Sequence, residues 1–161
     1  MNSLTNPGNT SKELYFFESR FDVPNNFSGI CEIKAEIKTK DWYLNGLLHR
    51  INGPAVEWVN GDKAWYIHGK LHRIDGPAIE RANGKKEWFL NGKRHRTDGP
   101  AVEYSDGSKS WFIHGKRHRT DGPAIEHVEG DKAWYLNHQR YGINNDFNTQ
   151  SWRHFQKTLL F

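Results

Sequence analysis

A histidine followed by an arginine recurs four times in this chain, and aspartate or asparagine follows two residues after the arginine. The copies are His49, Arg50 and Asn52; His72, Arg73 and Asp75; His95, Arg96 and Asp98; and His118, Arg119 and Asp121. A base beside a cation and a carboxylate could serve catalysis, but a catalytic site needs one asymmetric arrangement of base, nucleophile and charge stabiliser. Four equivalent copies offer the same trio repeatedly. We therefore predict that the chain is not an enzyme and has no catalytic residues.

Two interpretations of this motif remain open from the sequence. In the structural one, each arginine pairs with a carboxylate of its own or the next unit, and each histidine satisfies backbone groups at a turn. In the other, the four copies form a His/Arg stripe that contacts a ligand or nucleic acid.

Histidines spaced four residues apart raise the question of a metal site. The pairs are His68 with His72 and His114 with His118. On a helix this spacing would place both imidazoles on one face, but Gly69 and Gly115 indicate a turn here. A zinc site uses three or four protein ligands, and no cysteine or third histidine follows nearby in the sequence. We predict no metal site and no cofactor.

Glutamate and lysine also recur in register with the motif. The glutamates are Glu57, Glu80, Glu103 and Glu126, and the lysines are Lys63, Lys86, Lys109 and Lys132. We expect these residues to be partners across neighbouring strands rather than general acids. The single cysteine, Cys31, has no base beside it and is expected to be a small buried hydrophobe rather than a nucleophile.

The elements that must hold these residues form a repeat of 23 residues, marked by one tryptophan in each unit. The tryptophans are Trp42, Trp65, Trp88, Trp111 and Trp134. A fixed period of this size is the signature of an array in which one supersecondary unit stacks on its neighbours. The units also alternate in pairs, for example Asn45 with His68 and Asn91 with His114, and we attribute this 46-residue period to packing or duplication.

Each unit predicts short antiparallel strands connected in a meander. The aromatic and branched residues after each tryptophan favour strand, and Asn-Gly or His-Gly supplies the positive φ of a tight hairpin turn. Asp-Gly-Pro is a second turn, and Ala-Val-Glu or Ala-Ile-Glu is a further short strand. Two or three strands in each unit follow. The predicted fold class is all-β, an elongated antiparallel β-hairpin repeat array.

The two ends of the chain depart from the repeat. We predict a flexible tail at residues 1–12, a degenerate N-terminal β cap at 13–41, four repeats at 42–133, and a last hairpin with a C-terminal capping helix at 134–161. The cap contains two predicted strands, LYFFESRFDV and ICEIKAEIK, the latter with Ile33, Ala35 and Ile37 on one face. Sliding the repeat back by 23 residues aligns Ile33 with Val56.

The C-terminal segment has the apolar spacing of a short amphipathic helix. Its apolar residues are Trp152, Phe155, Leu159 and Leu160, and Asn148 or Thr149 can cap its start. We interpret the helix as a lid over the last tryptophan layer. A helix that binds a partner is the alternative.

Composition limits the remaining function classes. A formal charge of +4 and a pI of about 9.2 permit contact with nucleic acid or an acidic protein but do not require it. A mean hydropathy of -0.89 with 22 aromatic residues suits a thin core of a few large side chains. No run approaches the roughly 20 apolar residues of a membrane span, and a lone cysteine fits a reducing compartment. We therefore expect a cytoplasmic protein with no membrane insertion.

Residues that differ between units are the ones free to recognise a partner. One such set is Trp58, Arg81, Tyr104 and His127, and a basic edge adds Lys93, Arg94, Lys116 and Arg117. Trp, Tyr and Arg are enriched at binding hot spots, and stacked units would align the first set in one row. The alternative is that Trp58 and Tyr104 complete the hydrophobic layer.

The string W-Y-x-N-G-K-x-H-R-x-D-G-P-A, from Trp42 to Asn137, resembles repeats of tailed bacteriophage and giant-virus proteins, and more loosely the MORN repeat. The resemblance implies a β-hairpin array. MORN arrays are associated with protein scaffolding and membrane lipids, but the His-Arg-x-Asp-Gly-Pro segment departs from MORN, which argues against a lipid role.

We predict a non-enzymatic protein-binding module, a phage-encoded inhibitor or adaptor that acts on a host defence or nucleic-acid-handling complex in the host cytoplasm. Nucleic-acid binding through the His/Arg/Lys stripe is the alternative, and a small-ligand sponge ranks below it. An exposed sheet edge or the terminal helix could also pair two copies as a homo-oligomer.

Overall fold

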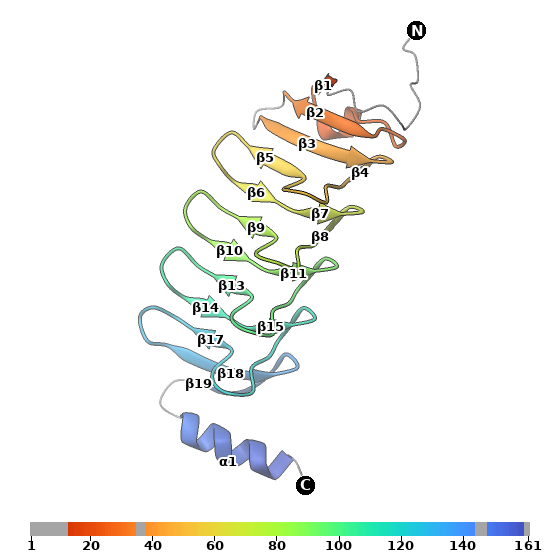
Figure 1. The fold of residues 1–161 in the computed structure, drawn as a ribbon. Helices are drawn as coiled ribbons and strands as arrows, with labels where there is room; N and C mark the ends of the chain where they lie inside the picture. Colours follow the sequence, from red (N-terminus) through yellow and green to blue (C-terminus); the bar gives the residue numbers. More distant parts are fainter. Residues whose placement is uncertain (1–12, 35–37, 144–147, 160–161) are drawn as a thin grey trace.

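The computed structural model describes residues 13–34, 38–143 and 148–159. It is an elongated array of β-hairpins with one helix at its C-terminal end (Figure 1), as the repeat predicts. The predicted tail at 1–12, the positions of Ala35, Ile37 and Leu160, and the side chain of Leu159 lie outside the described residues.

One long sheet of thirteen strands runs through the array and is built mainly from one long hairpin in each unit. Its strands are β1 (Leu14–Phe17), β2 (Gly29–Ile33), β3 (Thr39–Leu44), β4 (Leu47–Leu48), β5 (Val56–Trp58), β6 (Lys63–Ala64), β9 (Ile79–Glu80), β10 (Lys86–Glu87), β13 (Val102–Glu103), β14 (Lys109–Ser110), β17 (Ile125–Glu126), β18 (Lys132–Leu136) and β19 (Gln139–Ile143). β4 pairs with β3, and the other strands follow one another across the sheet in chain order.

A second, shorter hairpin in each unit lies beside the long one (Figure 1). These hairpins are β7 (Tyr66–Ile67) with β8 (Lys70–Leu71), β11 (Phe89–Leu90) with β12 (Lys93–Arg94), and β15 (Phe112–Ile113) with β16 (Lys116–Arg117). A unit such as 65–87 therefore has four very short strands, rather than the two or three expected. In such a unit the loop with the His-Arg motif runs from the short hairpin to the long one, between β8 and β9.

The short hairpins turn at the dipeptides predicted for that purpose. Asn91 has a φ of 51° and Gly92 a φ of 79°, and His114 and Gly115 repeat this pattern at 50° and 83°. Two successive residues of positive φ match the twist of the flanking strands. Neighbouring short hairpins are then joined through the backbone, because the Gly92 N–H donates to the Leu71 carbonyl at 2.8 Å.

The N-terminal cap differs from the prediction in two respects. β1 ends at Phe17 and a 3-10 helix follows at Arg20–Asp22, so LYFFESRFDV is not one strand, and β1 pairs with β2 in parallel. The cap hairpin is also longer than those of the repeat. Cys31 pairs with Asp41 and Val56 pairs with Ala64, so more residues separate the paired positions in the cap than in the repeat. Cys31, and not Ile33, therefore occupies the place of Val56.

The C-terminal end is covered by helix α1 (Thr149–Leu159) beside the hairpin of β18 and β19 (Figure 1). The Asn148 side chain caps the helix and accepts the N–H groups of Gln150 and Ser151, both at 2.9 Å. Trp152 is fully buried, and its Nε1–H donates to the Thr120 carbonyl at 2.9 Å. Asn148 is thus the cap, and the tryptophan anchors the helix on the last complete unit.

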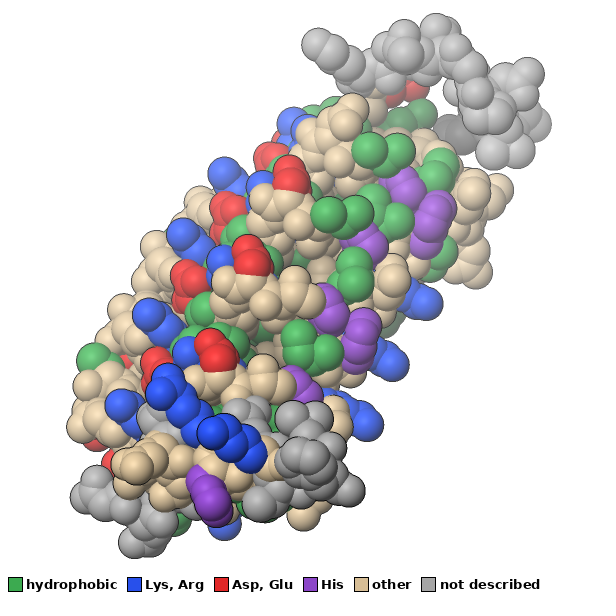
Figure 2. Space-filling view, turned by 60° about the horizontal axis from the view of Figure 1, so that its bottom comes forward, with side chains coloured by type: hydrophobic (Ala, Val, Ile, Leu, Met, Phe, Trp, Pro, Cys, Tyr) green, Lys and Arg blue, Asp and Glu red, His purple; other side chains and the backbone are tan. Residues whose placement is uncertain are grey.

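Alternation along each strand gives the sheet two faces. The tryptophan face is defined by the repeated tryptophans and by glutamates and lysines that alternate from strand to strand. This charged ladder is Glu32, Lys40, Glu57, Lys63, Glu80, Lys86, Glu103, Lys109, Glu126 and Lys132. Figure 2 shows acidic and basic side chains recurring along the length of the array, with most histidines gathered in a column.

The opposite, tyrosine face carries one aromatic ring in each unit together with buried aliphatic side chains. The rings are Tyr43, Tyr66, Phe89, Phe112 and Tyr135. Beside them lie the buried side chains of Val56, Ala64 and Val102, at 1–2% exposure. The core is therefore a thin layer that continues from unit to unit.

Candidate functional site

The arginine of the His-Arg motif is occupied by contacts within its own unit. The Arg96 guanidinium lies 4.0 Å from the Trp88 ring centre and donates to Asp98 at 3.0 Å, to the Pro100 carbonyl at 3.2 Å and to Glu103 at 3.0 Å. Arg73 and Arg119 repeat this set, and Arg50 stacks on Trp42 at 3.9 Å. The structural interpretation of these arginines therefore agrees with the geometry.

The Asp-Gly-Pro turn completes this arrangement around the arginine. The pKa of Asp98 is lowered, chiefly by the hydrogen bond from Arg96. A Cβ atom on Gly99 would lie 3.0 Å from the Arg96 Cζ atom, so glycine allows the turn to approach the guanidinium. A positive φ is not the reason for glycine at this position, because Gly99 is not among the glycines of positive φ.

The repeated glutamates have two kinds of partner, the predicted lysines and the motif arginines, for which the structural interpretation expected a carboxylate of the same or the next unit. Lys86 lies opposite Glu80 and Glu103 in the strand register, as expected of ladder partners. The ion pairs, however, join these glutamates to the arginines of their own units, with Glu80 2.9 Å from Arg73. The carboxylates thus hold the motif loop against the sheet.

The histidines accept backbone N–H groups from the following unit. The His95 Nδ1 atom accepts the N–H of His114 at 3.1 Å, and the His72 Nδ1 atom accepts the N–H of Asn91 at 3.2 Å. Each histidine therefore stabilises the turn residue of the next short hairpin. The 46-residue alternation corresponds to this contact, because the turn residue is histidine in one unit and asparagine in the next.

The imidazoles come together between units and not at the spacing of four residues. His49 and His68 have ring centres 4.5 Å apart, and His95 and His114 are 4.4 Å apart. The pKa values of His49 and His95 are lowered, first by burial and then by the neighbouring imidazole. Among the residues that the structure describes, no group of three or more metal-binding side chains occurs.

The variable residues Trp58, Arg81, Tyr104 and His127 occupy equivalent places at the base of each long-hairpin loop. Trp58 is half-buried, with the guanidinium groups of Arg20 and Arg81 at 5.7 Å and 5.8 Å from its ring centre. Arg81 also pairs with Asp62 at 2.8 Å. These positions form a row along the array, which we call the variable row.

The C-terminal part of the variable row is more accessible. Tyr104 is 41% exposed with Lys85 at 5.2 Å from its ring, and His127 is exposed. Tyr104 is thus open to solvent beside Lys85, whereas the half-buried Trp58 is the member of the row that fits the alternative of a hydrophobic layer.

The predicted basic edge separates into two kinds of residue. Lys93 and Lys116 are exposed on the short hairpins, whereas Arg94 and Arg117 are half-buried on the tyrosine face. Arg94 donates to Glu87 at 2.7 Å and 2.9 Å, and Glu87 also pairs with Lys85 at 2.8 Å. The four residues therefore do not form one continuous basic patch.

Two buried carboxylates on the tyrosine face were not identified from the sequence. Asp41 is fully buried and accepts Arg20 at 2.6 Å and 3.1 Å, and Glu87 is 4% exposed. Burial by itself would raise the pKa of Glu87, but the hydrogen bonds from Lys85 and Arg94 outweigh it and lower the pKa. Both residues occupy the place of Ala64, so comparison of the units could have revealed them.

Cys31 is completely buried beside Asp41. Burial, followed by the Asp41 carboxylate, raises the pKa of its thiol to about 12. This thiol is poorly suited to act as a nucleophile, in agreement with its interpretation as a small core residue.

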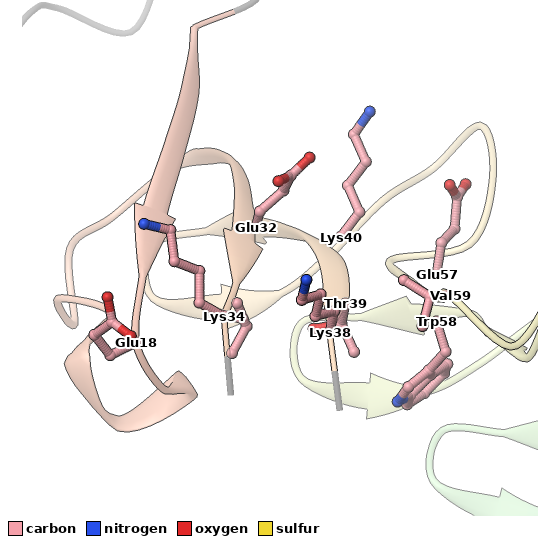
Figure 3. A pocket seen from close by; sticks show the side chains of 10 residues that line it. Glu18, Glu32, Lys34, Lys38, Thr39, Lys40, Glu57, Trp58 and Val59 are labelled. Carbon is pink, nitrogen blue, oxygen red and sulfur yellow. The ribbon is translucent and has the colours of Figure 1, made fainter. Parts of the chain in front are cut away.

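A cavity of about 690 Å³ lies where the cap meets the first unit. Figure 3 shows Glu32, Lys40 and Glu57 on one side of the strands and the Trp58 side chain on the other. Acidic and basic side chains alternate along its rim as members of the charged ladder. The cavity contains no nucleophile with an adjacent base among the described side chains that line it.

Neither a scan against protein-family models nor a search of curated proteins gives a match to this chain. In the described part of the chain, no helix has the length and hydropathy to cross a membrane.

Proposed function

We propose that this chain is a non-enzymatic protein-binding module that presents the variable row to a partner. The observation that carries this proposal is that the residues common to all units contact the scaffold, whereas residues that vary between units are accessible. Residues common to all units, such as Arg96 and His95, are engaged in the scaffold, while the variable row includes Tyr104 and His127 at its accessible end. The viral resemblance suggests a host assembly as the partner.

Nucleic-acid binding receives less support from the side-chain contacts. Four motif arginines are engaged by carboxylates of their own units, and Arg94 by Glu87. Of the predicted basic edge, the exposed Lys93 and Lys116 and the half-buried Arg117 remain for phosphates, and binding through them would weaken steeply with salt.

An affinity pull-down from a bacterial lysate tests the proposal, with and without nuclease and at two salt concentrations. We expect a stoichiometric protein that survives both treatments and is lost with Tyr104→Ala combined with His127→Ala. Ile74→Ala is the control, because Ile74 is 86% exposed in the loop of the His-Arg motif and outside the variable row. Recovery of nucleic acid alone, released by high salt, would favour the alternative; turnover of a nucleotide abolished by one substitution would contradict the proposal.

A further inference from the structure

The tyrosine face pairs a buried acid with arginine at two positions along the array and leaves an arginine unpaired at a third. The place of Ala64 is taken by Asp41 in the cap, by Glu87 at the end of unit 65–87 and by Ser110 at the end of unit 88–110. Seven residues after these four places come Leu48, Leu71, Arg94 and Arg117, in chain order. Ala64 and Leu71 are both apolar and Glu87 precedes Arg94, whereas Arg117 has Ser110 in place of the acid.

The two carboxylates that are buried on this face among the described residues, Asp41 and Glu87, are each held by an arginine. Arg20 binds Asp41 through its Nε and Nη2 atoms, at 2.6 Å and 3.1 Å. Arg94 donates from the same two atoms, at 2.9 Å and 2.7 Å, but both bonds go to the Oε2 atom of Glu87. Arg20 reaches both oxygens of Asp41, which is the two-pronged geometry that a guanidinium offers to a carboxylate.

Arg117 repeats Arg94 without an acceptor. Its guanidinium lies 5.8 Å from the Phe112 ring centre and 5.5 Å from that of Tyr135, and its Nε atom is buried. No hydrogen bond or ion pair engages this guanidinium among the described residues. Arg94 lies 5.6 Å from the same Phe112 ring, so two arginines flank it.

We infer that Arg117 marks a carboxylate-binding subsite on the tyrosine face, which takes an aspartate or glutamate side chain of a protein partner. The inference rests on the proposed protein-binding function and specifies the chemistry of the partner. A carboxylate is favoured over a phosphate because this chain places a carboxylate against Arg94, the equivalent of Arg117, and another against Arg20 on the same face. Ser110 is shorter than the Glu87 it replaces and has no carboxylate, and no described residue supplies one to Arg117, so a partner is the source of the acid in this inference.

The subsite also adjoins the row already proposed for binding. Ser108 occupies the place of Lys85, and the backbone N–H of Tyr104 donates to its carbonyl at 2.9 Å. Ser110, at the place that faces Arg117 in the repeat, lies two residues beyond Ser108, so the subsite belongs to the unit next to that of the accessible Tyr104. One partner segment could engage both.

The test uses Ser110→Glu, which supplies the missing acid from within the chain. This change should place a carboxylate against Arg117, as Glu87 is placed against Arg94. It should therefore raise the melting temperature and occlude the subsite. An oligoglutamate peptide is titrated into labelled protein at low ionic strength, and the Arg117 Nε–Hε resonance is followed by NMR. We expect this resonance to shift in the wild type, and the affinity to fall about tenfold or more in Ser110→Glu.

Ser105→Glu is the matched control, because it adds the same charge at an exposed loop position of the same unit. It should change the affinity less than Ser110→Glu does. Arg117→Met should also abolish the binding, and Ser110→Glu remains informative if that variant is unstable. Equal effects of the two glutamate variants, or peptide shifts confined to Lys93 and Lys116, would overturn the subsite. A shift with oligothymidylate and not with oligoglutamate would overturn the choice of a carboxylate.

The outcomes separate this inference from the proposed function. A protein partner that Ser110→Glu and Arg117→Met still bind as wild type, with no peptide shift at Arg117, would overturn the subsite and leave the binding function standing. Peptide binding at Arg117 without any protein partner in the pull-down would support the subsite and overturn the proposed protein-binding function.

Discussion

Arginine in the His-Arg motif performs several tasks that lysine could not combine. Its planar guanidinium stacks on a tryptophan ring while its nitrogens reach a turn carbonyl and the carboxylates at both ends of the loop, as Arg96 shows. A lysine ammonium has no such planar fork. The motif arginine therefore holds the loop against the sheet. This structural role is needed in every unit, which accounts for the repetition of the motif.

The histidines that contact a second histidine should make the array sensitive to pH. Burial, and then the adjacent imidazole, lower the pKa of His49 and His95 below the ordinary value of 6.5. The unfolded chain binds these protons at higher pH, so protonation favours unfolding. We expect the melting temperature to decline as pH falls below about 6.5 and these contributions to be complete above it.

NMR titration of the imidazoles checks this prediction. His68→Asn and His114→Asn introduce the asparagine that the alternate units have at the turn. They remove the neighbouring imidazole, which is the second cause of the lowered pKa values. The pKa values of His49 and His95 should rise in these variants. Titration of both histidines at or above the ordinary value in the wild type would contradict the prediction.

Among the elements, the two hairpins of each unit are stabilised differently. The long hairpins share one continuous hydrogen-bonded sheet, whereas the short hairpins depend on turn residues such as Asn91 and on backbone bonds to their neighbours. Strands of two residues would not persist alone. Each short hairpin thus derives its order from the unit beside it, and the last unit needs a cover.

Helix α1 provides that cover, and Trp152 anchors it. Trp152→Ala removes a fully buried ring and its hydrogen bond to the Thr120 carbonyl, and should lower the free energy of unfolding by about 3–5 kcal/mol. Hydrogen exchange should show loss of protection in α1 first. Lys157→Ala, at an exposed position of the same helix, is the control. Unchanged protection of α1 in Trp152→Ala would rule out the anchoring role.

At the scale of the whole molecule, the charged ladder makes each strand a partner of both neighbours. Glutamate and lysine alternate across the sheet from Glu32 to Lys132, so each inner member faces two opposite charges. Such a pattern opposes a slip of register, since a shift by one strand residue would bring apolar and charged side chains together. The ladder therefore supports the regular stacking of all units.

Reversing one charge tests this idea. Lys86→Glu places a third acid between Glu80 and Glu103 and should lower the free energy of unfolding by about 1–2 kcal/mol, an effect that salt reduces. Urea unfolding at two salt concentrations measures it. Lys70→Glu makes the same charge change on a short hairpin, outside the ladder. Equal losses in the two variants would exclude a specific role for the ladder.

The strongest local signals were enough to predict the architecture. The 23-residue period, the Asn-Gly and His-Gly turns and the apolar spacing around Trp152 predicted the array, its short hairpins and its C-terminal helix. These features depend on neighbours in the sequence, on backbone sterics and on side-chain periodicity. The parallel pairing of β1 and the longer cap hairpin lack such signals, and the sequence missed both.

The sequence by itself determined which residues recur and which vary, and therefore where the scaffold ends and the variable row begins. Only the tertiary structure decided which charges are matched. Arg94 and Arg117 occupy the same place in the repeat, yet Arg94 forms an ion pair with the buried Glu87, whereas Arg117 has a serine, Ser110, at the place of that glutamate and its Nε atom has no partner. The reason is physical: side chains on different strands become partners through register and burial, which a linear pattern does not contain.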